Sequence, residues 1–265
     1  MKQLVLFSNS LQFIKLIHSF SSFKINSVFI DSKKEELEII TYCKWNNIKI
    51  SYFSEEKITN TDFSEIDYAF TFGFNYIFSS KIINQFKEGI WNIHPGELPK
   101  YRGRHPIQWA FINGEKKIGV TIHKINEKID RGELLGLDYV DVEVDDTEKD
   151  VIHKIFNLLK SNLLLDSIYH NTVGKTITLD KGTYYPSLQK GIQFTSFLDY
   201  TSTEFFNLLR SQKDFGGLRI KNKIYTKAHY FIDGCLGTYP NSEIITFKDN
   251  KKLILFYNDS RSLAV

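Results

Sequence analysis

The 265-residue chain is predicted to have an α/β fold, with a Rossmann-like, mostly parallel sheet in an N-terminal domain and a small α+β C-terminal appendage. Short apolar runs alternate with helical patterns through the first two-thirds of the sequence, which is typical of βαβ crossovers. This alternation stops near Lys181, where strand-like runs become dominant. Hydrophobic residues make up 42% of the chain, which is enough for a sizeable core. We therefore expect two domains, over residues 1–180 and 181–265.

Strands are expected where apolar and β-branched residues run together between turn-forming residues. In the first domain these runs cover residues 3–8, 25–31, 48–53, 68–74, 89–93 and 119–125. Helices are expected where apolar residues recur with helical spacing, over residues 11–20, 33–45, 106–112 and 147–170. Pro106 is well suited to a first helical turn, and Asp146 or Thr147 can cap the longest helix.

The appendage is predicted to contain a short helix over residues 202–209 and strand-like runs over 218–232 and 243–256. The last run, EIITFKDNKKLILFY, predicts two strands around an Asp249-Asn250 turn, and therefore a β-hairpin. The edges of such a hairpin carry unpaired backbone groups, so we expect a homodimer contact there.

Composition argues against several classes of protein. The net charge is only +3, with Lys and Glu interleaved, so no nucleic-acid partner is expected. Cys43 and Cys235 lie far apart, and no histidine pair has zinc-site spacing, so neither a disulfide framework nor a bound metal is expected. The sequence has no 18-residue apolar span and no signal-peptide pattern, so we expect no membrane association and a cytoplasmic location.

The segment IWNIHPGELPKYRG carries the strongest chemical signal. Asn92 and His94 are two residues apart at the end of a predicted strand, so they share one face. Ligands of open α/β sheets bind outside the carboxyl ends of the strands. An amide can hold a developing oxyanion while an imidazole takes a proton, which acyl transfer to an amine requires. Alone, such a pair is more often an ordinary strand-end turn.

Two further segments belong to the same hypothesis. The loop over residues 126–132 follows a predicted strand and presents Asp130 beside the turn glycine Gly132. The segment over residues 73–77 is an apolar strand end with exposed backbone groups.

The stretch NIHPGELPKYRGRHPIQWAFINGEKKIGVTIHKINEKIDRGELL resembles the catalytic core of the folate-dependent formyltransferases. That family includes glycinamide ribonucleotide transformylase, methionyl-tRNA formyltransferase and the nucleotide-linked sugar N-formyltransferases. Its motifs occur here in order, as Asn92 with His94, Leu98-Pro99 with Arg102-Gly103, Gly119-Val120-Thr121, and Asp130-Arg131-Gly132. Four ordered motifs are a strong signal, whereas any one of them would be weak.

The resemblance implies that N10-formyltetrahydrofolate donates a formyl group to a substrate amine, without a metal. Asn92 would stabilise the tetrahedral oxyanion, and His94 would accept the ammonium proton or assist its transfer. Asp130 would orient His94 or a bridging water, and would favour the imidazolium. The pterin would contact the backbone of two segments, at Tyr76 and Phe78 and at the loop that includes Asn126 and Ile129.

The resemblance is greatest to the dTDP-sugar N-formyltransferases of surface-polysaccharide (O-antigen) pathways, and the expected acceptor is dTDP-4-amino-4,6-dideoxyglucose. The purine enzyme binds a phosphate with a Gly-rich loop after its first strand, whereas this chain has no glycine there. The transfer-RNA enzyme carries a larger, basic C-terminal barrel. Expected substrate contacts are Ser8, Asn9, Asn75, Arg102 and Arg104, with Tyr184, Tyr185 or Phe194 stacking on the base.

Three rival functions remain at this point. Methionyl-tRNA formyltransferase predicts salt-dependent binding of transfer RNA. A formyltetrahydrofolate deformylase would use water as the nucleophile, but that family usually carries an extra N-terminal domain, whereas the first strand here begins at Gln3. A non-catalytic binding module would not be expected to keep Asn92, His94 and Asp130 together.

Overall fold

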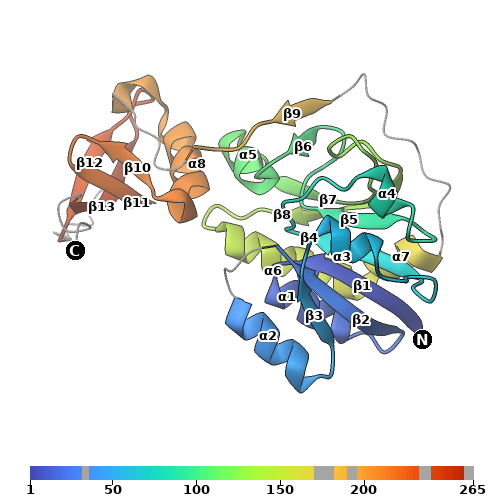
Figure 1. The fold of residues 1–265 in the computed structure, drawn as a ribbon. Helices are drawn as coiled ribbons and strands as arrows, with labels where there is room; N and C mark the ends of the chain where they lie inside the picture. Colours follow the sequence, from blue (N-terminus) through green and yellow to red (C-terminus); the bar gives the residue numbers. More distant parts are fainter. Residues whose placement is uncertain (32–35, 170–181, 190–195, 233–239, 260–265) are drawn as a thin grey trace. The chain divides into compact units, whose positions relative to one another are not determined.

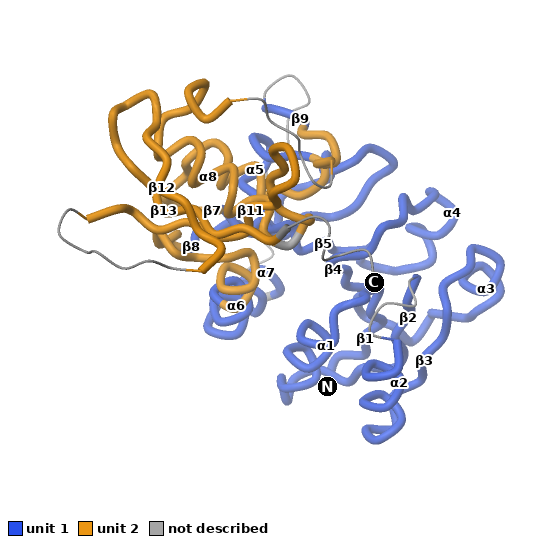
Figure 2. Tube along the Cα trace, turned by 90° about the vertical axis from the view of Figure 1, so that its left-hand side faces the viewer, with its two compact units in different colours: residues 1–102, 119–140, 154–184 blue, residues 103–118, 141–153, 185–265 orange. Residues whose placement is uncertain are grey.

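The structure, a computed structural model, describes residues 1–31, 36–169, 182–189, 196–232 and 240–259 (Figure 1). The chain forms two compact units, which Figure 2 shows in separate colours. The first unit contains residues 1–102, 119–140 and 154–184, and the second contains 103–118, 141–153 and 185–265. Two internal segments therefore group with the C-terminal part of the chain. The division into domains at residues 180 and 181 stays a prediction.

A seven-stranded sheet forms the first unit, in the order β3-β2-β1-β4-β5-β7-β8 (Figure 1). Strands β3, β2, β1, β4 and β5 are parallel, whereas β7 runs antiparallel to β5. The strands are Lys2–Ser8 (β1), Phe23–Ile30 (β2), Lys49–Tyr52 (β3), Tyr68–Phe72 (β4), Ile90–His94 (β5), Lys117–Lys124 (β7) and Leu134–Asp141 (β8). This arrangement confirms the predicted fold class.

Helices cover both faces of this sheet, because its central strands are apolar on both sides. On one face, Phe72 of β4 contacts Phe13 and Phe156, which lie on helices α1 and α6. On the other face, Ile58 and Ile82 of α3 and α4 pack into a core cluster with strand residues. The helices are Leu11–His18 (α1), Glu36–Trp45 (α2), Glu55–Thr59 (α3), Ser80–Ile83 (α4), Glu148–Leu158 (α6) and Leu164–Tyr169 (α7), with a π-helical turn, Leu159–Leu163 (η1), between the last two.

Several elements differ from the sequence-based expectations. The strand β8 and the short helices α3 and α4 were not predicted; neither were the strands β6 (Tyr101–Gly103) and β9 (Thr183–Tyr185), which form a two-stranded sheet. Strand β8 is hard to recognise from the sequence, because it is only partly buried and Gly136 interrupts its apolar run. The predicted first residues of α2, 33–35, and the predicted last residue of the 147–170 helix lie outside the described residues.

The second unit contains helices α5 (Pro106–Ile112) and α8 (Ser202–Gln212), the short turns η2 (Phe197–Asp199) and η3 (Lys213–Phe215), and a four-stranded antiparallel sheet. Its strands are β10 (Leu218–Ile220), β11 (Lys223–Tyr230), β12 (Ser242–Thr246) and β13 (Lys252–Asp259). The run over residues 218–232 is a hairpin rather than one strand, since Lys221 turns the chain with a φ of 50°. The turn predicted at Asp249-Asn250 is present, with a φ of 61° at Asn250.

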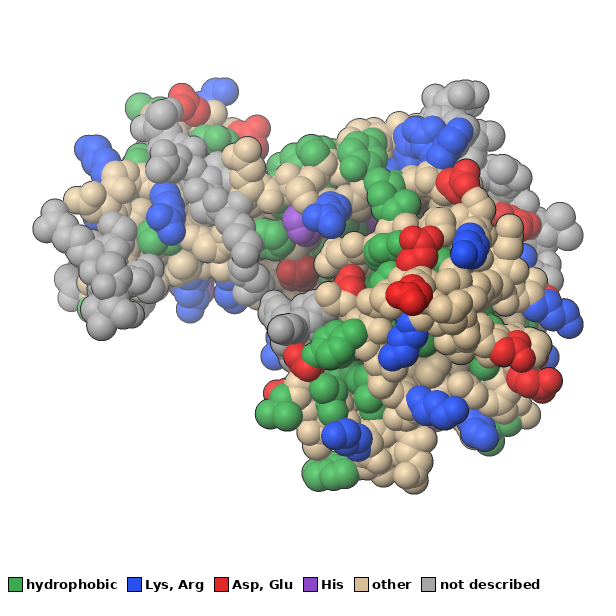
Figure 3. Space-filling view, viewed as in Figure 1, with side chains coloured by type: hydrophobic (Ala, Val, Ile, Leu, Met, Phe, Trp, Pro, Cys, Tyr) green, Lys and Arg blue, Asp and Glu red, His purple; other side chains and the backbone are tan. Residues whose placement is uncertain are grey.

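Positive and negative side chains are interspersed on the face shown in Figure 3. Among the residues with described positions, no helix is long and apolar enough to cross a membrane, and no three His, Cys, Asp or Glu side chains gather as a metal site would require. Cys43 is buried as a free thiol, whereas Cys235 lies outside the described part of the chain.

Candidate active site

The pairing of β5 with β7 brings the chemically useful side chains to one face of the sheet. Asn92 lies opposite His123, and His94 lies opposite Thr121, in the antiparallel register. Alternate residues of a strand share a face, and directly opposed residues are neighbours on it. The four side chains therefore form one patch at the carboxyl end of β5.

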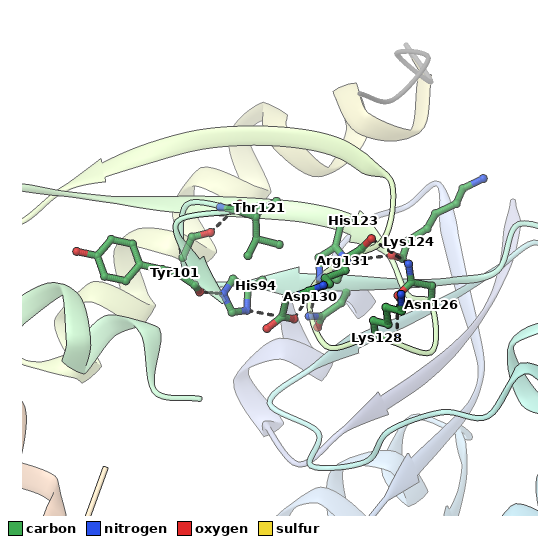
Figure 4. Close-up of polar contacts among 12 residues, drawn as sticks. His94, Tyr101, Thr121, His123, Lys124, Asn126, Lys128, Asp130 and Arg131 are labelled. Carbon is green, nitrogen blue, oxygen red and sulfur yellow. Dashed lines mark hydrogen bonds and ion pairs between the residues drawn. The ribbon is translucent and has the colours of Figure 1, made fainter. Parts of the chain in front are cut away.

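His94 is held in one orientation by the backbone. Its Nε2 lies 2.6 Å from the carbonyl oxygen of Tyr101, which can only accept a hydrogen bond, so Nε2 carries a proton. In the neutral ring Nδ1 is then the basic nitrogen, and it lies 3.7 Å from Oδ1 of Asp130 (Figure 4). A proton taken up at Nδ1 would therefore be stabilised by the Asp130 carboxylate.

Burial governs the protonation of His94. Only 4% of the residue is exposed, and this desolvation lowers the pKa of His94 below its ordinary value of 6.5. The Asp130 carboxylate and the Tyr101 carbonyl raise this pKa in part, whereas His123 lowers it. His94 is thus neutral near pH 7, which is the state that a general base needs.

His123 fixes the amide of Asn92. Its Nδ1 donates to the carbonyl oxygen of Lys124 over 2.9 Å, so Nε2 is free to accept a hydrogen bond. Nδ2 of Asn92 donates to this Nε2 over 3.1 Å, and Oδ1 of Asp130 lies 3.5 Å from the same nitrogen. The second amide proton of Asn92 is then available to a developing oxyanion.

Asp130 is presented by a tightly braced loop (Figure 4). Oδ1 of Asn126 accepts a hydrogen bond from the backbone N–H of Lys128, and its Nδ2 donates to the carbonyl oxygen of Arg131; both distances are 2.9 Å. Asp130 has a φ of 52° within this closed turn. A Cβ atom on Gly132 would lie 1.5 Å from the carbonyl oxygen of Lys124, so only glycine fits beside β7.

A second loop places the Tyr101 carbonyl against His94. Oγ1 of Thr121 donates to the carbonyl oxygen of Gly96 over 2.6 Å and accepts from the backbone N–H of Leu98 over 3.1 Å. Both bonds are buried, and they fold the segment after β5 back over β7. The Thr121 hydroxyl thereby helps to set the ring orientation of His94.

The residues expected to bind the pterin lie in two segments, one with Tyr76 and Phe78 and the other with Asn126 and Ile129. The side chains of Tyr76 and Phe78 pack into the core around Phe53, with ring centroids 4.3 and 5.9 Å from it. Phe78 is buried and Tyr76 is partly buried, and residues 76–78 make no backbone hydrogen bond within the described structure. Backbone donors and acceptors are therefore open to a ligand, and the pterin contact there stays a prediction. In the other loop the Asn126 amide braces the turn, and Ile129 is 43% exposed.

Three of the expected substrate contacts meet at the carboxyl ends of β1 and β4. The Ser8 hydroxyl is fully buried and donates to the carbonyl oxygen of Phe72 over 2.7 Å. Asn9 and Asn75 both bond to one carboxylate, Asp31: Nδ2 of Asn9 donates to its Oδ1, and the backbone N–H of Asn75 donates to its Oδ2 over 2.9 Å. Asp31 closes the group by donating its own N–H to Oδ1 of Asn9 over 3.0 Å.

Arg102 is buried, with 4% of its surface exposed, and its Nη2 donates to the carbonyl oxygen of Gly182 over 3.2 Å. Its Nε and Nη1 have no hydrogen-bond partner among the described residues. Arg104 and Tyr185 belong to the second unit. There the Tyr185 ring packs against Trp109 with centroids 4.9 Å apart. Tyr184 is exposed, and Phe194 lies outside the described residues.

Two residues of these clusters were not selected from the sequence. For His123, the alternation of Thr121 and His123 in one strand was the available signal, but its meaning depends on the register with β5. Asp31 ends a predicted strand and carried no motif. Its role is visible only because three strand ends converge on it.

A buried imidazole beside a carboxylate and a fixed amide, at the carboxyl edge of a mostly parallel sheet, defines a site for acyl transfer. Comparison with known families identifies the class of enzyme. The model of the formyl transferase family matches residues 1–167, and the chain belongs to this family.

Individual relatives extend this comparison. The chain is 30% identical over 199 residues to the bifunctional polymyxin resistance protein ArnA of Wigglesworthia glossinidia brevipalpis, covering 73% of this chain and 29% of that protein. It is 32% identical over 151 residues to the methionyl-tRNA formyltransferase of Natranaerobius thermophilus, covering 56% of this chain and 48% of that protein. The chain thus spans less than half the length of these relatives.

A solved structure has the same fold over nearly the whole chain. It is the N-formyltransferase of Helicobacter canadensis in complex with folinic acid and dTDP-3-aminofucose, with a TM-score of 0.74 and 19% identity. The match covers 97% of this chain and 100% of that one.

Proposed function

We propose that this chain transfers a formyl group from N10-formyltetrahydrofolate to the amine of a dTDP-linked amino sugar. The observation that carries the proposal is the arrangement of His94, with its basic Nδ1 directed at Asp130, beside the oriented amide of Asn92. The proposed acceptor is dTDP-4-amino-4,6-dideoxyglucose, and the proposed setting is surface-polysaccharide (O-antigen) biosynthesis.

Asn92, His94 and Asp130 each have a separate role in the proposed reaction. The donor supplies a formyl carbon that an amine nitrogen can attack, with formation of a C–N bond. Asn92 donates its available N–H to the oxygen that becomes negative. His94 takes the proton that the attacking nitrogen releases, at Nδ1, and Asp130 stabilises the resulting imidazolium. His94 then returns this proton to the departing N10 nitrogen as the bond to the formyl carbon breaks, so the enzyme ends in its starting state.

Two features favour a nucleotide-linked sugar over the other acceptors of the family. The turn after β1 has no glycine, and its Ser8 hydroxyl is bonded to β4, so it does not form a Gly-rich phosphate loop. The Helicobacter canadensis protein that shares this fold was solved with a dTDP-linked amino sugar. The proposed contacts to this acceptor are Ser8, Asn9, Asn75, Arg102, Arg104 and Tyr185.

Methionyl-tRNA formyltransferase is the second candidate, because the chain is 32% identical over 151 residues to the Natranaerobius thermophilus enzyme. That function predicts binding of transfer RNA that weakens steeply with salt.

The deciding experiment mixes the purified chain with N10-formyltetrahydrofolate and a panel of dTDP-amino sugars, and detects formylated products by mass spectrometry. The panel contains both 4-amino and 3-amino isomers, and a parallel reaction contains methionyl-tRNA. We expect turnover with the 4-amino-4,6-dideoxyglucose nucleotide and none with methionyl-tRNA. Turnover with methionyl-tRNA alone would refute the sugar assignment, and turnover with a 3-amino isomer alone would correct the ring position.

A further inference from the structure

Side-chain contacts hold the segment over residues 73–80, which is the loop after β4 together with the first residue of α4 and is called here the 73–80 loop. Its side chains alternate: Phe74, Tyr76 and Phe78 pack into the core cluster, whereas Asn75 and Ile77 are exposed, Ile77 by 63%. This alternation leaves the backbone at the surface. Because residues 76–78 make no backbone hydrogen bond in the described structure, the loop depends on side chains for its position.

Three carboxylates from three different elements hold this loop. Oδ2 of Asp31, at the end of β2, accepts from the backbone N–H of Asn75 over 2.9 Å. Glu55 of α3 accepts from the Tyr76 hydroxyl over 3.3 Å and from the Ser79 hydroxyl over 2.6 Å. Glu127, in the loop over residues 126–132, accepts from the Ser80 hydroxyl.

The third contact joins the two segments that are expected to bind the pterin. Ser80 follows the segment of Tyr76 and Phe78, while Glu127 belongs to the loop that presents Asp130. One hydrogen bond to a charged acceptor therefore links the two segments that are expected to bind folate. Charge-assisted bonds of this kind are stronger than neutral ones, although exposure to solvent weakens them.

We propose that Asp31, Glu55 and Glu127 are positioning residues for folate, which fix the backbone of the 73–80 loop in the conformation that binds the pterin. This inference rests on the proposed function. Each carboxylate acts through the loop and needs no contact with the reacting atoms, so its removal should weaken folate binding.

The test compares Asp31→Ala, Glu55→Ala and Glu127→Ala with a matched control, Glu56→Ala, an exposed glutamate on the same helix as Glu55. Folinic acid is titrated into each full-length variant by calorimetry, and KM for N10-formyltetrahydrofolate and kcat are measured in parallel. We expect the Kd for folinic acid to rise about tenfold in Glu127→Ala, equivalent to about 1.4 kcal/mol. In Glu55→Ala, which lies outside both the Asp130 loop and the Asn9–Asn75 cluster, kcat should stay within about twofold, because only ground-state binding is lost. The control should match the wild type.

Two comparisons separate positioning from charge alone. Folates carry negative carboxylates, so the loss of a negative side chain would strengthen binding if only the charge mattered. We expect weaker binding instead, and partial rescue in Glu127→Gln, which keeps an acceptor oxygen for Ser80. Tighter binding in the alanine variants would overturn the proposal.

A double-mutant cycle tests the contact between the two loops. Ser80→Ala and Glu127→Ala should be non-additive, because each removes the same bond. Additive losses of affinity would contradict the proposal, provided that thermal melting shows each variant to be folded. If the wild-type chain binds folinic acid and the variants bind it equally well, this inference fails alone; if the wild type binds none, the proposed function fails as well.

Discussion

The patch of side chains on β5 and β7 and the 73–80 loop, which follows β4, are held in different ways. His94 and His123 are almost fully buried, and each ring donates to a backbone carbonyl that fixes its tautomer. The loop is held instead by exposed carboxylates from other elements. The side chains of the patch face the proposed reaction, whereas the carboxylates only position the loop that is proposed to bind folate. We therefore expect substitutions in the patch to reduce turnover, and substitutions around the loop to reduce affinity for folate.

The largest effect should come from His94, the proposed base. His94→Ala removes the proton acceptor, and we expect kcat to fall by about 10³- to 10⁴-fold, in the upper range for a general acid–base group. The Kd for folinic acid should change little. Stopped-flow or steady-state assays give the rate, with the exposed His229→Ala as control. If His94→Ala turns over like the wild type, the proposed role of the patch is wrong.

Asp130→Asn should give a smaller loss and a diagnostic shift with pH. Because burial lowers the pKa of His94 below 6.5, kcat/KM should decline as the pH falls through a value below 6.5. The carboxylate raises this pKa, so its removal should move the decline to still lower pH, and we expect the plateau to fall by about 10²-fold. A decline that moves to higher pH in Asp130→Asn would contradict the assigned electrostatics.

The same depressed pKa affects folding. The unfolded chain takes up a proton at His94 at a higher pH than the folded chain does, so this residue's contribution to stability is complete above pH 6.5 and is lost as the pH falls through the folded pKa.

The smallest of these effects concerns the turn that presents Asp130. Gly132→Ala places a Cβ against the Lys124 carbonyl, and we expect the free energy of unfolding to fall by about 1–3 kcal/mol, with a loss of kcat as Asp130 shifts. Gly89→Ala is the matched control, because the added Cβ there meets no atom within 4 Å and only its φ of 71° opposes the change. Urea unfolding measures both. If Gly132→Ala and Gly89→Ala lower the free energy of unfolding equally, the close approach at Gly132 does not contribute to the loss.

Local patterns in the sequence were sufficient for the fold class and for the pairing of Asn92 with His94. The apolar runs, the alternation of strands with helices, and Pro106 at the first turn of α5 are all confirmed. These features depend on contacts between residues close in the chain, where periodicity of 2.0 or 3.6 residues is decisive.

The elements that were missed depend on partners far away in the chain. Strand β6 has three residues and is defined by its pairing with β9, about 80 residues later. Likewise, the 218–232 run contains two strands because Lys221 turns the chain, which composition did not reveal. Short or partly buried elements give too few residues for periodicity to be recognised.

The sequence by itself indicated the class of chemistry through four ordered motifs, and it determined that Asn92 and His94, two residues apart on a strand, share a face. Only the tertiary structure decided which nitrogen of His94 is basic and what orients Asn92. Both depend on the Tyr101 and Lys124 carbonyls and on the opposition of His123 to Asn92 across two strands. Register, loop closure and burial arise from contacts distant in the chain, and they convert a pair of side chains into a site with assigned protons.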